Sequence, residues 1–261
     1  MTNKTNIGNL KPASCNRCTV RARTLFGTVD ENKIPATQTY RNEYCHFSAG
    51  EIIHQEQHSI DYAFTLHTGC LILYNDLSSG ERQILRVVLP GDFVGFSRNN
   101  KGELLYSIKA ESDSHACLFF DENVTKMVGE NSEVAKRLIE LQAHETSLCQ
   151  QRLLNLGHKT AAESLAYLIM ELYARMRVQS PKDFNFITGE AFFPLSQADM
   201  GDALGLTKVH VNRVIARFKN QGLIVYGHKK MRVIDEKSLS AIAQFDVNLI
   251  EDPFRQFETF A

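Results

Sequence analysis

Three glycines spaced eleven residues apart constrain the fold of the first half of this chain more than any other feature. Gly69, Gly80 and Gly91 each stand at a turn-like site, and the short segments between them are rich in β-branched and aromatic residues. Short strands that recur at this spacing, separated by turn residues, are typical of antiparallel sandwiches and barrels. We therefore expect a domain over residues 31–130 that is built as an antiparallel sandwich or barrel.

The pattern changes to helical spacing after this region. Apolar side chains follow one another at intervals of three and four residues, and Asn131 or Ser132 can cap the start of the helix. We expect one long helix over residues 131–157, a hinge at Gly157 to Lys159 and a second helix over residues 160–179. A long helix between two domains often pairs with its twin in a homodimer, although such a stripe can also pack on the chain's own sheet. The residues assigned to the dimer contact are Leu138, Leu141 and Leu148.

The net charge of −1 hides an uneven distribution of charge. Residues 205–232 contain seven Lys and Arg side chains and no Asp or Glu, whereas the rest of the chain carries 22 basic and 30 acidic residues, a balance of −8. A polyanion would be attracted to this one segment and repelled by much of the remainder. The alternative is a basic face that contacts only solvent. The complete lack of acidic residues in this segment argues against that alternative.

The same basic segment has the pattern of two helices followed by a hairpin. We expect helices over residues 197–204 and 208–221, with a tight turn at Gly205, and strands over residues 223–226 and 231–234. This is the order of a winged helix-turn-helix, whose second helix is narrow enough to enter the major groove of DNA. A helical hairpin used only for packing is the alternative. The residues that can cap the two helices are Ser196, Asp199 and Thr207.

These residues resemble a known family. The string LSQADMGDALGLTKVHVNR at residues 195–213, continued by RFKNQGLI at 217–224, is similar to the helix-turn-helix of Crp/Fnr-type regulators. The string LPGDFVGF at residues 89–96 extends the resemblance to the β-roll. The resemblance implies an α+β chain with a jelly-roll sensor domain, a dimerisation helix and a C-terminal winged helix-turn-helix domain over residues 158–261. It also implies a homodimer that reads a palindromic operator in double-stranded DNA, with RNA polymerase as the downstream partner.

The first turns of the second helix supply the side chains for the base edges. Arg213 matches the family's arginine, and arginine can bond a guanine edge through two hydrogen bonds. Val209 stands where many members carry a glutamate that accepts from cytosine, so it would contact a thymine methyl group instead. The residues assigned to base contact are Lys208, Val209, His210, Asn212 and Arg213. The residues assigned to the DNA backbone are Ser196, Thr207, Arg217, Lys229 and Lys230.

The cysteines make an iron–sulfur cluster one candidate for the sensed signal. By the resemblance, Cys15, Cys18 and Cys117 match three cluster ligands of the oxygen-sensing branch. The third N-terminal cysteine is absent, because Thr24 and Phe26 stand at the positions where the branches carry it. Three thiolates are one ligand short of a standard cluster. The alternative is two surface thiols and a cysteine that packs as a small apolar side chain.

The fourth ligand and the rival signals stay open at this stage. Cys45 or His46 could complete the cluster. The family's nucleotide pocket places an arginine beside a serine or threonine, and no arginine stands beside Ser107, which argues against cyclic AMP because a buried phosphate needs a cation. Haem ligation is disfavoured because nothing in the sequence fixes the geometry of the histidines near the β-roll. Those histidines are His46, His54, His58 and His67.

Other classes of protein fit the sequence less well. A redox or small-molecule module that acts through protein–protein contacts is the runner-up to a DNA-binding regulator. A thiol oxidoreductase would need a strand before its Cys-x-x-Cys motif, whereas residues 1–30 look irregular. We find no catalytic dyad, phosphate loop or paired-histidine metal motif, so we do not expect an enzyme. No apolar run is long enough to span a membrane and the N-terminus has no signal-peptide pattern, so we expect a cytoplasmic protein.

Overall fold

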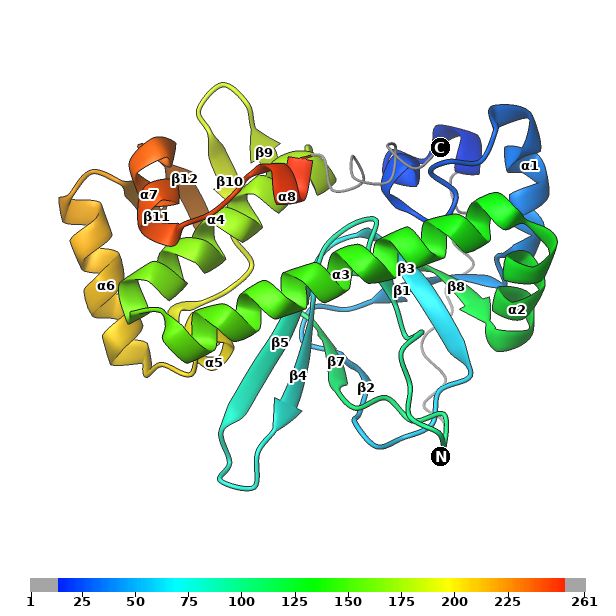
Figure 1. Cartoon of the computed structure of the whole chain (residues 1–261), viewed down its shortest axis with the longest axis horizontal. Coiled ribbons are helices and arrows are strands. Elements are labelled where there is room, and N and C mark those ends of the chain that lie inside the picture. The colour runs from blue at the N-terminus through cyan, green and yellow to red at the C-terminus, as the bar shows by residue number, and fades with distance from the viewer. Residues whose placement is uncertain (1–13, 252–261) are drawn as a thin grey trace. The chain divides into compact units, whose positions relative to one another are not determined.

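A computed structural model describes residues 14–251 (Figure 1). Its contacts divide these residues into two compact units. The first unit holds residues 14–75 and 85–143, and the second holds Asp76–Ile84 together with residues 144–251. Among the described residues, no helix combines the length and the apolar character that crossing a membrane requires.

The first unit is built on the antiparallel β-domain that the glycine spacing predicts. Two antiparallel four-stranded sheets have the strand orders β1-β8-β3-β6 and β2-β7-β4-β5. Gly69, in the turn between β3 and β4, has a φ of +90°, and a Cβ there would collide with the Ser114 side chain. The strands are β1 (Glu43–Phe47), β2 (Ile52–His54), β3 (Tyr62–Thr68), β4 (Leu71–Asp76), β5 (Arg82–Val88), β6 (Phe93–Val94), β7 (Ser107–Ala110) and β8 (Ser114–Phe120).

The two faces of the β1-β8-β3-β6 sheet have different partners. Side chains alternate between the faces along each strand, and the register pairs Tyr44 with Cys117 and Cys45 with Ala116. The face of Cys45 forms the core between the sheets, whose members include Phe47, Phe64, Leu66, Leu71, Ile108 and Leu118. The face of Cys117 contributes to a second core, whose members include Leu25, Phe26, Ala63, Phe119, Met127, Val134 and Leu138.

Helices and the N-terminal segment cover this second core. Arg137 is buried there, and its guanidinium donates to the carbonyl oxygens of Ala22 and Thr24 at 3.0 and 3.4 Å and to the Glu140 carboxylate at 3.2 Å. The long helix α3 is thereby bonded to the segment that follows the two N-terminal cysteines. The elements are η1 (Cys15–Arg17), η2 (Arg21–Arg23), η3 (Glu31–Lys33), α1 (Ile34–Thr37), η4 (Gln38–Tyr40), α2 (Asp121–Glu130) and α3 (Ser132–His158).

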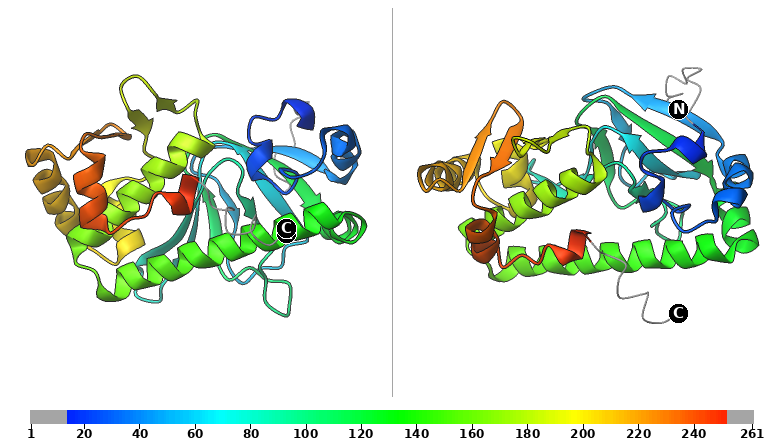
Figure 2. Two further views of the ribbon diagram at one scale, coloured as in Figure 1. Left: turned by 45° about the horizontal axis from the view of Figure 1, so that its top comes forward. Right: turned by 90° about the horizontal axis from the view of Figure 1, so that it is seen from above.

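Helix α3 is as long as the sequence predicts and lies one residue further along the chain. Asn131 caps it, because its side-chain oxygen accepts from the amides of Glu133 and Val134 at 3.0 and 3.2 Å. The break expected at Gly157 to Lys159 begins at Lys159, since α3 continues through Gly157 to His158 as one uninterrupted green helix in Figures 1 and 2. A glycine inside a helix costs only about 1 kcal/mol relative to alanine, which the final turn of a 27-residue helix tolerates.

The second unit places its helix-turn-helix beside a small sheet. That sheet is antiparallel, with strand order β11-β12-β10-β9. Helix α4 starts at Thr160, whose hydroxyl and the Glu163 carboxylate form a reciprocal capping box. The elements are α4 (Ala161–Gln179), β9 (Phe184–Asn185), β10 (Glu190–Phe192), α5 (Gln197–Leu204), α6 (Lys208–Asn220), β11 (Ile224–Gly227), β12 (Lys230–Val233), α7 (Glu236–Ala243) and α8 (Asn248–Glu251).

Candidate nucleic-acid interface and thiol pocket

Helix α5 begins with the capping box that the sequence predicts. The Ser196 hydroxyl accepts from the Asp199 amide at 3.2 Å, and the Asp199 carboxylate accepts from the Ser196 amide at 2.9 Å. Arg82 donates to the carboxylates of Asp199 at 2.5 Å and Asp202 at 2.7 Å. Burial would raise the pKa of Asp199, but the bonds from Ser196 and Arg82 outweigh it and hold that pKa below its ordinary value. The start of α5 is therefore fixed from two sides.

Two glycines, one at the end of α5 and one inside it, let α5 and α6 approach closely. Gly205 ends α5 in the left-handed conformation, with a φ of 63°. Gly201, inside α5, lies against the carbonyl of Leu206, and a Cβ at this position would collide with that oxygen. The turn is thus closed by backbone packing that admits no side chain at Gly201.

Helix α6 has one buried face and one basic face. Thr207 caps it by accepting from the His210 amide at 3.2 Å. Its buried side chains are the four that the sequence predicts, namely Val211, Val214, Ile215 and Phe218. The residues assigned to base contact all lie on its exposed side, and Val209 is 69% exposed although it is apolar. Among the described residues, no carboxylate forms an ion pair with Lys208 or Arg213. This face is free of the acidic side chains that would repel a phosphate.

The hairpin that follows α6 forms a tight basic wing. Strands β11 and β12 pair from Ile224↔Val233 to Gly227↔Lys230, which leaves His228 and Lys229 as the turn. Both turn residues are left-handed, with φ values of 52° and 57°, as a two-residue hairpin loop requires. Lys229 is exposed, whereas the Lys230 ammonium pairs with Glu190 at 2.7 Å. The wing therefore offers Lys229 as an uncompensated cation and Lys230 as a partly neutralised one.

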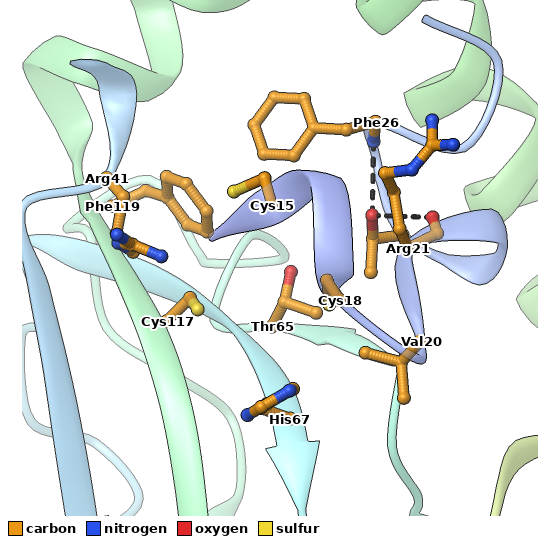
Figure 3. Close-up of a pocket in the computed structure, with 11 residues that line it drawn as sticks. Cys15, Cys18, Val20, Arg21, Phe26, Arg41, Thr65, His67, Cys117 and Phe119 are labelled. Carbon is orange, nitrogen blue, oxygen red and sulfur yellow. Dashed lines mark hydrogen bonds between the residues drawn. The ribbon is translucent and has the colours of Figure 1, made fainter. Parts of the chain in front are cut away.

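A pocket in the first unit brings together the three cysteines singled out from the sequence. Cys15, Cys18 and Cys117 line it, together with His67 and two arginines, as Figure 3 shows. Thr65 pairs with Cys117 across β3 and β8, so both belong to the outer face of the sheet. The pocket is otherwise apolar, and its remaining lining residues are Val20, Arg21, Thr24, Phe26, Arg41 and Phe119.

Burial opposes ionisation of two of the pocket's thiols, those of Cys15 and Cys117. It raises the pKa of Cys117 to about 11, and the Arg41 guanidinium, which hydrogen-bonds to that thiol, opposes the shift only in part. Burial likewise raises the pKa of Cys15, against the opposing charge of Arg41. In residues 14–251, no group of three or more His, Cys, Asp or Glu side chains is arranged to hold a metal ion. A metal bound here would have to displace protons and draw the side chains together.

Comparisons with known proteins identify the family. A Crp-like helix-turn-helix domain matches residues 163–242, and a cyclic nucleotide-binding domain matches residues 44–131. The chain belongs to the Crp/Fnr family of transcription regulators. The transcriptional activator protein FnrL of Cereibacter sphaeroides is 28% identical over 224 residues, which cover 85% of this chain and 88% of FnrL. The nitrogen fixation regulation protein FixK of Bradyrhizobium diazoefficiens is 25% identical over 229 residues, which cover 88% of this chain and 93% of FixK.

A solved structure supports the same assignment. The structure of FixK2 from Bradyrhizobium japonicum has a TM-score of 0.67 and 26% identity, and the match covers 76% of this chain and 96% of that one. As a Crp/Fnr regulator, the protein is a DNA-binding transcription regulator. The prediction that it is not an enzyme is confirmed by its family, whose members are regulators.

The leucines assigned to the dimer contact lie inward in this Crp/Fnr chain. Leu138 belongs to the outer core and Leu141 packs against it. Leu148 is only 3% exposed. The sequence left open the alternative that this apolar stripe packs on the chain's own sheet, and the burial of these leucines agrees with it. The large apolar side chains that α3 does expose are Ile139, Leu153, Leu154 and Leu156.

The other candidate ligands are dispersed over the β-roll. Cys45 faces the core between the sheets, away from Cys117. His46 lies against His115, with 5.0 Å between ring centroids. His54 bonds to the carbonyl of His58 at 3.0 Å. These histidines and His67 do not converge on one point as haem ligands, and Cys45 cannot join the thiol pocket without changing faces.

Sequence reasoning missed two arginines and misassigned one histidine. Arg41 hydrogen-bonds to Cys117, and Arg82 fixes the start of α5. His67 was considered only as a haem candidate, yet it lines the thiol pocket. Alternation along β3 could not have found it, because the register of β3 with β8 shifts between Leu66 and Thr68; His67 is placed by its contact with Tyr44, the register partner of Cys117.

Proposed function

We propose that this Crp/Fnr regulator reads a two-fold-symmetric operator through the exposed face of α6. Arg213 and Asn212 would bond base edges, with Lys208 and His210 beside them, and Val209 would contact a thymine methyl group. The exposed, acid-free surface of α6 is the observation that carries the proposal, because a groove-binding helix must present its polar side to the duplex. Ser196, Thr207, Arg217, Lys229 and Lys230 would hold the sugar–phosphate backbone, with Lys230 contributing least.

The homodimer would form along the exposed apolar side of α3. Ile139, Leu153 and Leu156 are exposed. Leu153 lies two seven-residue repeats after Ile139, and Leu156 follows three residues later, so the three share one side of the helix. Apolar residues at this spacing pair two parallel helices. Leu138 and Leu148 are buried and Leu141 is half-buried against the core, so these three leucines have less surface for a partner than that exposed side of the helix has. A two-fold dimer presents two copies of α6 to half-sites about one helical turn apart. RNA polymerase would be the downstream partner, as the activator name of FnrL suggests. Because its partner is chromosomal DNA, the regulator would act in the cytoplasm.

The signal would be received by an iron–sulfur cluster at the thiol pocket. Three thiols and one imidazole at a single pocket form a soft donor set, which suits iron–sulfur chemistry better than oxygen-rich cations. Cys15, Cys18 and Cys117 would hold the cluster, and Arg41 would offset part of its negative charge. A cluster bound there would supply sensitivity to oxidants. The phosphate of cyclic AMP would find no such support near Ser107, whose hydroxyl accepts from the Glu56 amide.

Replacing Arg213 tests the DNA-reading face directly. Duplexes are first selected from a random pool with the wild-type protein, and affinities are then measured for the selected and scrambled sequences. Arg213→Ala should lower affinity for the selected sequence by roughly 10- to 100-fold while leaving the scrambled one little changed, since a bidentate base contact contributes about 1–3 kcal/mol of discrimination.

The matched control is Lys229→Ala in the wing. It should weaken binding to both sequences alike and reduce the salt dependence of binding by about one phosphate contact. If Arg213→Ala keeps full preference for the selected sequence, α6 does not read the bases. Footprints that lack two symmetric half-sites would count against the dimer.

A further inference from the structure

The helix-turn-helix carries two acidic side chains at the place where it has to approach DNA. In residues 191–234, Asp199 and Asp202 on α5 are the only Asp and Glu residues, beside seven Lys and Arg residues. The first helix of a helix-turn-helix crosses the DNA backbone, so carboxylates on α5 come close to phosphates when α6 occupies the groove. Two uncompensated negative charges there would oppose binding.

One guanidinium from a distant part of the sequence meets both carboxylates. We propose that Arg82 is a positioning residue for DNA binding, because it offsets the charges of Asp199 and Asp202 and so lets α5 lie along a phosphate backbone. The inference rests on the proposed DNA-reading face of α6, since α5 reaches the backbone only in that arrangement. It adds to the interface a side chain that lies 117 and 120 residues before its two partners.

The geometry lets Arg82 serve both carboxylates at once. Its Nη2 donates to Asp199 Oδ1 at 2.5 Å and to Asp202 Oδ2 at 2.7 Å, and its Nε donates to Asp202 Oδ2 at 2.9 Å. Residues three apart on a helix lie on the same face, which is why one guanidinium can reach both. The three side chains are 23%, 13% and 32% exposed, so salt screens this contact less than it screens an open surface pair.

The next residue along the chain holds the other end of α5. Gln83 Nε2 donates to the carbonyl oxygen of Ala203 at 3.3 Å. That carbonyl belongs to the last turn of α5, where the helix itself supplies no donor. Arg82 and Gln83 both belong to Asp76–Ile84, which is part of the second unit. The support of α5 is therefore internal to the unit that carries the helix-turn-helix.

Protonation does not remove the charge that Arg82 meets. Burial raises the pKa of Asp199, but the bonds from Ser196 and Arg82 lower it by more, so this carboxylate is ionised at neutral pH. Asp199 also accepts from the amide of Ser196, one of the residues proposed for the DNA backbone, at 2.9 Å. A negative charge thus lies directly beside a proposed phosphate contact, and a cation is needed to offset it.

The test measures the affinity of full-length variants for the selected and scrambled duplexes at low and high salt, with melting temperatures recorded for each variant. Arg82→Gln should weaken binding to both duplexes by roughly threefold to tenfold at low salt, with the preference between them unchanged. The loss should shrink as salt rises, because it arises from repulsion between charges. Arg82→Lys should retain most of the affinity. Lys126→Gln, which removes an exposed cation from α2, is the matched control for net charge and should bind as the wild type does.

Removing the carboxylates separates repulsion from a loss of structure. The triple variant Arg82→Gln, Asp199→Asn, Asp202→Asn should recover the wild-type affinity to within about twofold, because the asparagine at 199 can still accept from Ser196 and no charge remains to be offset. A loss of affinity that is as large in the triple variant as in Arg82→Gln, or that does not shrink with salt, overturns the proposal. An Arg82→Gln protein that binds both duplexes as tightly as the wild type does so too.

Asp202→Asn keeps the proposal falsifiable if Arg82→Gln fails to fold. It leaves Arg82 bonded to Asp199, removes one negative charge from α5 and should tighten binding to both duplexes by about twofold to threefold at low salt. Unchanged affinity in this variant would contradict the proposed repulsion. An Arg213→Ala protein that keeps its sequence preference counts instead against the reading face of α6, so the two failures are distinguishable.

Discussion

The helix-turn-helix and the thiol pocket are assembled from the chain in opposite ways. The former takes all its parts from one continuous stretch, residues 196–234, and its caps and turns are made by neighbours in sequence. The pocket takes its lining from the N-terminal segment, from residue 41, and from two strands whose residues 65 and 117 meet only through sheet register. The DNA-reading part therefore depends mainly on its sequence neighbours, with Arg82 as a distant support of α5, whereas the pocket depends on packing elsewhere in the first unit.

The largest effect is expected at Arg137, which holds the N-terminal side of the pocket. Arg137→Ala removes the closer partner of the buried Glu140 and the donor to two carbonyl oxygens, which should cost about 3–5 kcal/mol of unfolding free energy. Denaturant unfolding measures this cost. Lys136→Ala is the comparison, because Lys136 is exposed and its ammonium lies 4.0 Å from the same Glu140 carboxylate, so its loss should cost at most about 1 kcal/mol. Equal stability of the two variants would show that the pocket does not depend on this guanidinium.

The next effect is expected inside the helix-turn-helix, at Gly201. Gly201→Ala places a methyl group against the Leu206 carbonyl, so the turn must open, at a cost of about 1–3 kcal/mol and with loss of DNA affinity. Gly157→Ala is the control: its Cβ meets nothing within 4 Å, and it should stabilise α3 by about 0.5–1 kcal/mol. Opposite signs for the same chemical change would tie the effect to packing of the turn. A Gly201→Ala protein that melts and binds as the wild type does would contradict it.

The smallest effect is expected at the cap of α6. Thr207→Ala removes the acceptor for the His210 amide and should cost about 1 kcal/mol. Because the first turn carries Lys208 and Val209, fraying there should also weaken operator binding. Thr207→Ser retains the hydroxyl and should behave as the wild type in thermal melts and binding assays. Similar losses in both variants would mean that the methyl group, rather than the cap, is what matters.

The contrast also explains what the sequence could reveal. The capping box at Ser196, the buried positions of α6 and the glycine turn follow from local spacing, and the structure has each of them. The antiparallel β-domain followed from glycine spacing alone, without its strand order. The hinge expected at Gly157 to Lys159 begins two residues later than Gly157, because a helix tolerates one glycine when nothing else ends it. The grouping of His67 with Cys117 needed the pairing of β3 with β8, which no local pattern encodes.

The apolar stripe assigned to the dimer contact shows the same limit of local sequence patterns. Leu138, Leu141 and Leu148 and the exposed Ile139 and Leu153 have comparable helical periodicity, so spacing alone cannot tell an inward stripe from an outward one. The deciding information is which side the sheet and the N-terminal segment cover, and that is a property of the assembled first unit.

The hydrogen bonds from Arg137 to two carbonyl oxygens connect α3 to the N-terminal segment that lines the pocket. Any inward pull on Cys15 and Cys18 strains the backbone that follows them, and a sealed-off guanidinium cannot trade its bonds for water without a large penalty. Movement of the segment that carries the two N-terminal cysteines would therefore act first on the part of α3 that holds Arg137.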